Sequence, residues 1–312
     1  MRIADLTALV ASCALCFGVL ELGLWIGGYE PRYQGKNLMV VPSANPRLIY
    51  EYRPNHRVVA GGVVVETNSD GFRDAEFPPE KPEEKFRIII VGDSVTFGMG
   101  ETSPYPQHLK ELLSRKFGPR FEVFNMSVVG YNSIQEVELV RSKALRFDPD
   151  LLIIGYVLND NKEDGGDGGL SRYFKQSGSR AYDWLRKSVK RLRRHLGKDV
   201  TTEAFEELAV LAAERRLPVV VVIFPRFALE ADGSYRKRAQ HAEVRALSER
   251  LGFRVFDLLE ALPLEQLAGL SEDALHPNAK GHEVVARQLL AFLERDGVLP
   301  GRNAAGSHRP GP

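Results

Sequence analysis

The sequence RIIIVGDSVTFG, residues 87–98, leads from a continuous apolar run directly into a turn that carries a serine. An apolar run without alternation is typical of a strand that is buried on both faces of a parallel sheet. Ligands of open α/β sheets bind beyond the carboxyl ends of the strands, so Ser94 lies where a nucleophile would be exposed. A helix that begins there can stabilise negative charge with its N–H groups. A serine at this position is also often only a helix cap.

Strands and helices alternate over the rest of the chain. Further apolar runs predict strands at 121–124, 151–154, 219–224 and 254–257. Helical spacing of apolar residues predicts helices at 105–117, 133–147, 203–215, 236–251 and 279–295. This alternation implies right-handed crossovers and a mostly parallel five-stranded sheet with helices on both faces.

Composition excludes several classes of protein. The 312 residues contain 42 Lys and Arg against 41 Asp and Glu, a net charge of +1, whereas a general nucleic-acid binder needs a surplus of basic side chains. We therefore expect no nucleic-acid partner. Both cysteines, Cys13 and Cys16, lie in the apolar N-terminal stretch. The remainder of the chain can thus form no disulfide, no cysteine metal site and no cysteine nucleophile.

The N-terminal stretch predicts a membrane anchor. Residues 6–20 carry no charge, and apolar residues resume after Glu21. About 20 apolar residues span a bilayer as a helix, so we expect residues 1–29 to form an uncleaved single-pass anchor, with the domain that follows extracytoplasmic. A cleaved signal peptide, a lipoprotein cleavage box ending at Cys13 and a buried helix of a soluble domain are the alternatives. The flanking Lys and Arg residues do not determine the orientation.

A leader segment, residues 30–85, separates this anchor from the α/β domain. It is rich in Pro, Gly and Asn. The β-branched runs at 57–60 and 63–66 flank Gly61-Gly62, a pattern that predicts a β-hairpin. The α/β domain itself is expected over 86–296.

An insertion, residues 161–200, interrupts the α/β domain after its third strand and is longer than most connections of this kind. It contains a candidate amphipathic helix with Trp184 and Leu185 on the apolar side and many Lys and Arg residues on the other. Such a helix can lie on an anionic membrane surface, or its basic side can be a solvated face. The tail at 297–312 is small, polar and expected to be disordered.

A second sequence feature supplies a base for Ser94. The sequence DALHPN, residues 273–278, directly precedes the last predicted helix. A serine hydroxyl is a poor nucleophile until a base takes its proton, and histidine suits that role near neutral pH. Asp273 lies three residues before His276 and can orient the imidazole. The six other histidines have no comparable local partner, and we interpret them as core or surface residues.

Two further segments end at the same edge of the sheet. NMSVVG, residues 125–130, follows the second strand, and Asn159-Asp160 follows the third. An oxyanion needs several converging donors, which the backbone N–H groups of Ser94 and Gly130 and the side-chain amide of Asn159 would supply. Alternatively, Gly130 is a turn glycine and Asn159 a loop residue.

The order Ser94, Gly130, Asn159, His276 resembles the SGNH (GDSL-type) hydrolase family, whose name records these four residue types. The resemblance covers about residues 86–296 without the insertion. It implies a three-layer α/β/α domain of flavodoxin-like appearance that hydrolyses carboxylic esters or thioesters, usually without metal. The third block departs from the family's usual Gly-x-Asn-Asp, because Val157 takes the place of the glycine. The sequence NSDGFR, residues 68–73, resembles a leader segment of membrane-anchored bacterial members.

We therefore expect a serine esterase that acts on lipid, small-molecule or acylated-glycan esters through a Ser94–His276–Asp273 triad, without metal or other cofactor. The oxyanion hole would be formed by Ser94, Gly130 and Asn159. An O-acyltransferase acting on cell-envelope glycans could use the same triad. A catalytically silent binding module is the third possibility, although binding alone does not need a base-activated serine.

Overall fold

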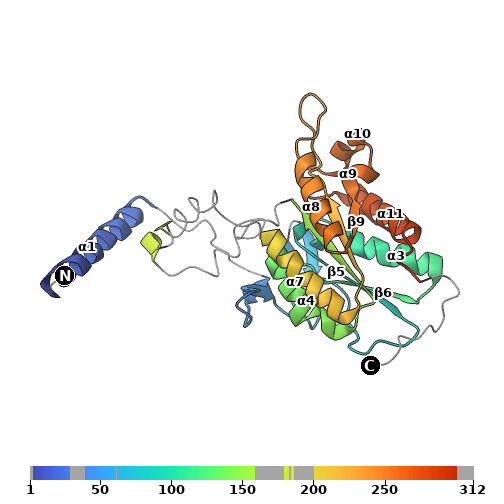
Figure 1. Ribbon diagram of the computed structural model, residues 1–312, viewed down its shortest axis with the longest axis horizontal. Coiled ribbons are helices and arrows are strands. Elements are labelled where there is room, and N and C mark those ends of the chain that lie inside the picture. Colours follow the sequence, from blue (N-terminus) through green and yellow to red (C-terminus); the bar gives the residue numbers. More distant parts are fainter. Residues whose placement is uncertain are drawn as a thin grey trace. The chain divides into compact units, whose positions relative to one another are not determined.

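The computed structural model describes residues 3–28, 39–60, 62–158, 179–182, 184–185 and 200–300. The chain divides into two compact units. One comprises residues 1–38 and 168–198, and the other comprises residues 39–167 and 199–312. Figure 1 shows the second unit as a sheet enclosed by helices.

The sheet of this second unit contains five parallel strands in the order β6-β5-β7-β8-β9. Its strands are β5 (Phe86–Gly92), β6 (Phe121–Asn125), β7 (Leu151–Val157), β8 (Val219–Phe224) and β9 (Arg254–Asp257). This order equals that of flavodoxin-like sheets, with β5 in the position of the first strand. All five predicted strands are confirmed to within three residues. β7 and β8 are buried along their whole length, as continuous apolar runs require.

Helices form layers on the two faces of the sheet (Figure 1). The helices α3 (Tyr105–Phe117) and α11 (Ala279–Arg295) pack against each other, and α4 (Ser133–Ser142) packs against α7 (Val200–Arg215). The helix α8 (Arg238–Arg250) packs beside β8 and β9. The predicted three-layer α/β/α architecture is confirmed.

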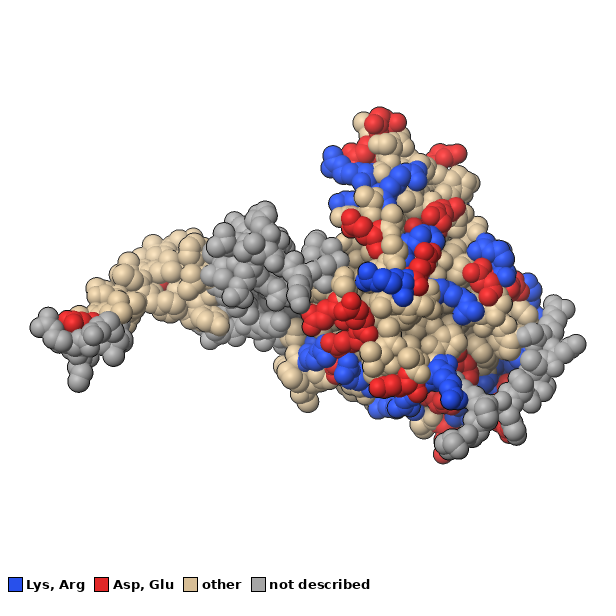
Figure 2. Space-filling view, viewed as in Figure 1, with Lys and Arg blue, Asp and Glu red and all other residues tan. Residues whose placement is uncertain are grey.

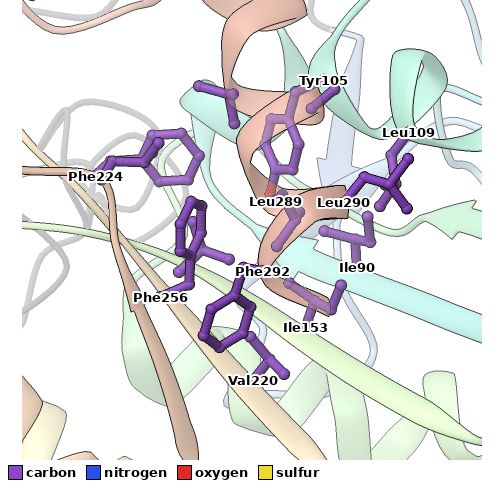
Figure 3. Close-up of a cluster of buried hydrophobic side chains, with 14 of the residues drawn as sticks. Ile90, Tyr105, Leu109, Ile153, Val220, Phe224, Phe256, Leu289, Leu290 and Phe292 are labelled. Carbon is purple, nitrogen blue, oxygen red and sulfur yellow. The ribbon is translucent and has the colours of Figure 1, made fainter. Parts of the chain in front are cut away.

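The main core lies between the sheet and the α3–α11 layer. Figure 3 shows Ile90, Ile153 and Val220 from the strands facing Leu289 and Phe292 of α11. All of these side chains are at most 3% exposed. Burial of this apolar surface, at roughly 25 cal/mol per Å², fixes the layer against the sheet.

The helix predicted over 133–147 is shorter in the structure. α4 ends at Ser142, and a 3-10 helix, η1 (Ala144–Phe147), follows. The buried Phe147 ring packs edge-on against Phe77 and Phe124, whose rings stack on each other. This aromatic cluster explains the break, because a continued α-helix would turn Phe147 away from its partners. Three short helices were not predicted: α9 (Leu258–Ala261), α10 (Leu264–Leu267) and η2 (Ala268–Leu270).

The described part of the leader belongs to the same compact unit as the sheet. β1 (Val40–Pro42) pairs antiparallel with β2 (Tyr50–Tyr52). β3 (Arg57–Ala60) and β4 (Val63–Glu66) form the predicted hairpin. The leader therefore contains two small sheets, of which the sequence predicted one.

The other unit contains the helix α1 (Ile3–Ile26). The carboxylate of Glu21 accepts hydrogen bonds from the N–H groups of Arg180 and Ala181, at 2.9 and 2.7 Å, and from the Ser179 hydroxyl.

Within the described ranges, no helix combines the length and the apolar character that crossing a membrane requires. The predicted transmembrane helix is therefore not supported. The basic face of the predicted helix in 161–200, and the tail beyond residue 300, lie outside the described residues.

Acidic and basic side chains are interspersed over the face shown in Figure 2. This mixture agrees with the net charge of +1. It gives that face no single-sign field of the kind that attracts a polyanion.

Candidate functional site

The turn after β5 holds Ser94 at the carboxyl edge of the sheet. Asp93 caps the short helix α2 (Ser94–Phe97) by accepting a hydrogen bond from the N–H of Val95 at 2.9 Å. The Thr96 side chain packs directly against Gly92 and Gly155, and a Cβ on either glycine would overlap its Oγ1 atom. Two glycines on adjacent strands thus let α2 lie directly on the sheet.

Ser94, His276 and Asp273 form one hydrogen-bonded chain. The Ser94 Oγ lies 2.9 Å from Nε2 of His276, and Nδ1 of His276 lies 2.6 Å from Oδ2 of Asp273. A carboxylate can only accept, so Nδ1 donates, and Nε2 of the neutral ring is left to accept the serine proton. This arrangement can activate the hydroxyl of Ser94 for attack on an acyl carbon.

The electrostatics of Asp273 favour a permanent negative charge. Its partial burial alone would raise its pKa. The hydrogen bonds from the His276 side chain and from the N–H groups of His276 and Leu275 outweigh that effect and lower the pKa to about 2. The carboxylate can therefore orient the imidazole and stabilise an imidazolium at neutral pH.

The loop that carries His276 is fixed at several points. Ser271 and Pro277 form an isolated antiparallel bridge, and the Ala274 carbonyl accepts a hydrogen bond from the N–H of Phe227 at 3.0 Å. Ala274 itself has φ 64°, a conformation that costs a residue with a Cβ about 1 kcal/mol. Asn278 caps α11 through the N–H of Gly281. The position of the imidazole is thus set by backbone contacts around it.

Gly130 lies in the loop that follows β6. The N–H of Val128 donates to the carbonyl of Gly92 at 3.0 Å, which holds this loop beside the turn that carries Ser94. Gly130 has φ 78°, a conformation that a glycine adopts without strain. Asn159, the third predicted oxyanion donor, lies outside the described residues.

Two buried carboxyl groups lie close to the serine turn. Desolvation raises the pKa of Asp93 to about 6, partly offset by its hydrogen bond from Val95 and by the charge of His276. Glu136, in the first turn of α4, is 0% exposed, and neither of its oxygens has a hydrogen-bond partner among the described residues. Desolvation first, and then the charge of Asp93, raise the pKa of Glu136 well above its ordinary value.

A second histidine network was missed by the sequence analysis. The buried His241 places its Nδ1 2.8 Å from Oδ1 of Asp257 and its Nε2 3.1 Å from the hydroxyl of Tyr235. That hydroxyl also accepts a hydrogen bond from the N–H of Arg226. The partner carboxylate lies 16 residues away, at the end of β9, so no local sequence spacing predicted this pair.

A metal centre has no basis in the described ranges. They contain no group of three or more His, Cys, Asp or Glu side chains that could hold a metal ion.

One family of known proteins matches the sequence. A sequence model of the GDSL-like Lipase/Acylhydrolase family matches residues 90–284, a range that contains both Ser94 and His276. No curated protein sequence matches the chain.

Solved structures resemble the chain at low identity. An acetyl xylan esterase shares 15% identity over 67% of this chain and 100% of its own, with a TM-score of 0.46. A lipase/acylhydrolase from Enterococcus faecalis shares 16% identity over 68% of this chain and 96% of its own, also with a TM-score of 0.46. A two-domain esterase active on acetylated mannans shares 18% identity over 69% of this chain and 50% of its own, with a TM-score of 0.45.

Proposed function

This chain belongs to the GDSL-like lipase/acylhydrolase family of ester-bond hydrolases, and we propose that Ser94, His276 and Asp273 are its catalytic triad. The observation that carries the proposal is the continuous hydrogen-bonded chain from Ser94 through His276 to Asp273, with contacts of 2.9 and 2.6 Å. A buried serine adjacent to a base that is itself oriented by a carboxylate is the arrangement that nucleophilic catalysis requires.

The proposed reaction has two halves. In the first, the Ser94 oxygen attacks the ester carbonyl while Nε2 of His276 takes its proton, and the collapse of the tetrahedral intermediate releases the alcohol with that proton. In the second, His276 takes a proton from water, the hydroxide attacks the acyl-enzyme, and the carboxylic acid leaves as Ser94 regains its proton. Asp273 stays ionised throughout, in keeping with its lowered pKa.

The oxyanion of each tetrahedral intermediate is proposed to bind the N–H groups of Ser94 and Gly130 and the side chain of Asn159. The carbonyl oxygen becomes fully charged only near the transition state, so donors fixed in advance lower the barrier. Removing one such donor from a serine hydrolase reduces kcat by about 10²–10³-fold.

The substrate is proposed to be a carboxylic ester of a lipid or of an acylated glycan. Transfer of the acyl group to a glycan hydroxyl uses the same triad and differs only in the acceptor. The two reactions are separated by incubating the chain with an acyl donor and a candidate glycan, and by measuring the ratio of transferred to hydrolysed acyl groups. If most acyl groups were transferred to the glycan, acyl transfer would replace hydrolysis as the proposed activity.

The decisive experiment compares Ser94→Ala with Ser248→Ala, using the full chain and a panel of p-nitrophenyl esters of increasing acyl length. Ser248 is also a buried serine, and its hydroxyl donates a hydrogen bond to the Val244 carbonyl within α8. Ser94→Ala is expected to lower kcat/KM by several orders of magnitude and to abolish labelling by a fluorophosphonate, whereas Ser248→Ala keeps both. Near-native turnover of Ser94→Ala would contradict the proposed nucleophile, and an unlabelled wild type would favour a silent binding module.

Membrane association and an extracytoplasmic location, expected from residues 1–29, remain part of the proposal. Alkaline extraction of membranes from producing cells, followed by protease treatment of intact spheroplasts, tests both. Recovery of the chain in the soluble fraction would contradict the first, and protection from protease would contradict the second.

A further inference from the structure

Two tyrosines of β2 hold the residue that precedes Gly130. The hydroxyl of Tyr50 donates a hydrogen bond to the carbonyl of Val129 at 2.8 Å. The hydroxyl of Tyr52 accepts one from the N–H of the same residue, also at 2.8 Å. Both polar backbone groups of Val129 are therefore bound by side chains that lie nearly 80 residues earlier in the chain.

The bound residue sits in a β-turn. The N–H of Tyr131 donates to the carbonyl of Val128 at 3.2 Å, so Val129 and Gly130 are the central residues of the turn. Gly130 has φ 78° while Val129 is not among the residues with positive φ, a combination that defines a type II turn. A type I turn differs from it by a flip of the central peptide.

That central peptide joins the Val129 carbonyl to the Gly130 N–H. Because a trans peptide is planar, its C=O and N–H point in opposite directions. The bond from Tyr50 to the carbonyl therefore also fixes the direction of the Gly130 N–H. In a type I turn the same N–H would point to the opposite side, away from an oxyanion that it serves in the type II turn.

The tyrosines are themselves fixed. Tyr50 is 0% and Tyr52 4% exposed. The Tyr50 carbonyl accepts a hydrogen bond from the hydroxyl of Tyr131, and the two rings make an edge contact with centroids 5.2 Å apart. The turn is thus bound to β2 on both sides of Gly130.

The NSDGFR sequence at 68–73 supports the same strand. The side-chain oxygen of Asn68 accepts hydrogen bonds from the N–H groups of Asp70 and Phe72, which builds a tight turn. Gly71 in this turn has φ 83°, and a Cβ there would lie 2.8 Å from the carbonyl oxygen of Tyr52. The turn therefore packs directly against the backbone that carries Tyr52.

The following residue, Arg73, binds the other side of the site. Its guanidinium donates to the carbonyls of Phe97 and Gly98, at 2.9 and 2.8 Å, where α2 ends. The Tyr52 ring also contacts that of Phe97, with centroids 5.4 Å apart. One leader segment thus contacts both the helix of Ser94 and the turn of Gly130.

We propose that Tyr50 and Tyr52 are positioning residues that hold the Val129–Gly130 peptide in the orientation that aims the Gly130 N–H at the oxyanion. This inference rests on the proposed function, because it assigns to the leader the assembly of the same oxyanion hole. The leader is then a functional part of the hydrolase. Tyr50 acts on the peptide that contains the donor, and Tyr52 acts on the peptide before it.

The test compares Tyr50→Phe and Tyr52→Phe with Tyr156→Phe as the matched control. Tyr156 is a buried tyrosine of β7, and its hydroxyl lies 3.4 Å from Thr201 Oγ1 on α7. Tyr50→Phe is expected to lower kcat by about tenfold to 100-fold. KM should change little, because the Gly130 N–H binds the substrate oxygen much more strongly in the transition state than in the ground state. Tyr52→Phe should have a smaller effect, and Tyr156→Phe almost none.

A second readout separates positioning from loss of folded protein. Each variant hydrolyses a matched pair of substrates, an ester and its thionoester, in which sulfur replaces the carbonyl oxygen and accepts hydrogen bonds poorly. The ester-to-thionoester rate ratio does not depend on the fraction of active enzyme. It is expected to fall about tenfold in Tyr50→Phe and to stay unchanged in Tyr156→Phe and in Asp273→Asn, which impairs the base only.

The outcomes distinguish the two proposals. A wild type that hydrolyses no ester and is not labelled at Ser94 would overturn the proposed function and this inference with it. An active wild type whose Tyr50→Phe variant keeps the substrate ratio would overturn this inference alone. A crystal structure of Tyr50→Phe gives a direct check, because loss of the positive φ at Gly130 is expected, and full retention of the type II turn would contradict the positioning role.

Discussion

Replacement of the buried Glu136 by glutamine should change how the stability of the protein depends on pH. The carboxyl group of Glu136 is fully buried without a partner among the described residues, and its pKa lies well above 4.5. In the unfolded chain the same group ionises near its ordinary value. Between these two values the folded state binds one proton more than the unfolded state.

The sign and size of the effect follow from this proton. Stability rises with pH only where the unfolded state binds more protons, so here each pH unit above 4.5 lowers the free energy of unfolding by about 1.4 kcal/mol. This loss continues with rising pH until the raised pKa of the folded carboxyl is reached. Glu136→Gln abolishes this loss. Burial of the unpartnered amide costs the same free energy at every pH. Any change with pH in the stability difference between variant and wild type therefore comes from the ionisation of Glu136.

The assay is urea unfolding of both proteins at pH 5, 6 and 7, extrapolated to water. Both tryptophans, Trp25 and Trp184, belong to the other compact unit, so tryptophan fluorescence would not follow the unfolding of the unit that contains Glu136. Circular dichroism is therefore the appropriate probe. The free energy of unfolding of the variant minus that of the wild type should rise with pH, by about 1.4 kcal/mol per pH unit below the raised pKa of the folded carboxyl. The control Glu283→Gln removes a carboxylate whose pKa is lowered by Arg287. Its stability difference from the wild type should not increase between pH 5 and pH 7. A constant difference for Glu136→Gln would refute the assignment of a protonated carboxyl.

Substitutions at three positions test the geometry of the site. Asp273→Asn should lower kcat by about 10³–10⁴-fold with little change in KM, because the amide no longer holds the His276 tautomer; steady-state kinetics would expose a smaller role. Gly155→Ala should destabilise the fold by about 1–3 kcal/mol and lower kcat, because the new methyl group overlaps Thr96; an unchanged Tm would contradict the tight packing of α2. Arg73→Met should lower Tm and kcat together, since two buried carbonyls lose their donor, and Arg73→Lys should recover part of both.

The fold was largely predictable because its strands carry unambiguous signals. β8 is six consecutive apolar residues, Val219–Phe224, and such a run can be buried on both faces only in the interior of a parallel sheet. The end of α4 was not predictable in the same way. Apolar spacing continues across Lys143, and the break depends on the contact of Phe147 with Phe77, which lies 70 residues earlier.

The contact between Ser94, His276 and Asp273 was predictable from local sequence, whereas their catalytic roles stay a prediction. Ser94 ends a buried strand, and Asp273 lies three residues from His276, so sequence spacing alone brought them into the hypothesis. The tyrosines that bind Val129 were not predictable, since nothing in β2 marks which loop their hydroxyls reach. The pairing of His241 with Asp257 was not predictable either, because the two residues lie on different elements with no local sequence pattern that links them.

The stacking of Phe77 on Phe124, with ring centroids 4.3 Å apart, bears on where the folding unit begins. The family match starts at residue 90, but a fragment cut there would leave β6 with the apolar face of Phe124 open to water. Phe72, on the far side of Phe77, would be lost as well. The smallest autonomous fragment is therefore expected to start before Phe72, so that expression of a piece starting at residue 90 would yield aggregated rather than merely inactive protein.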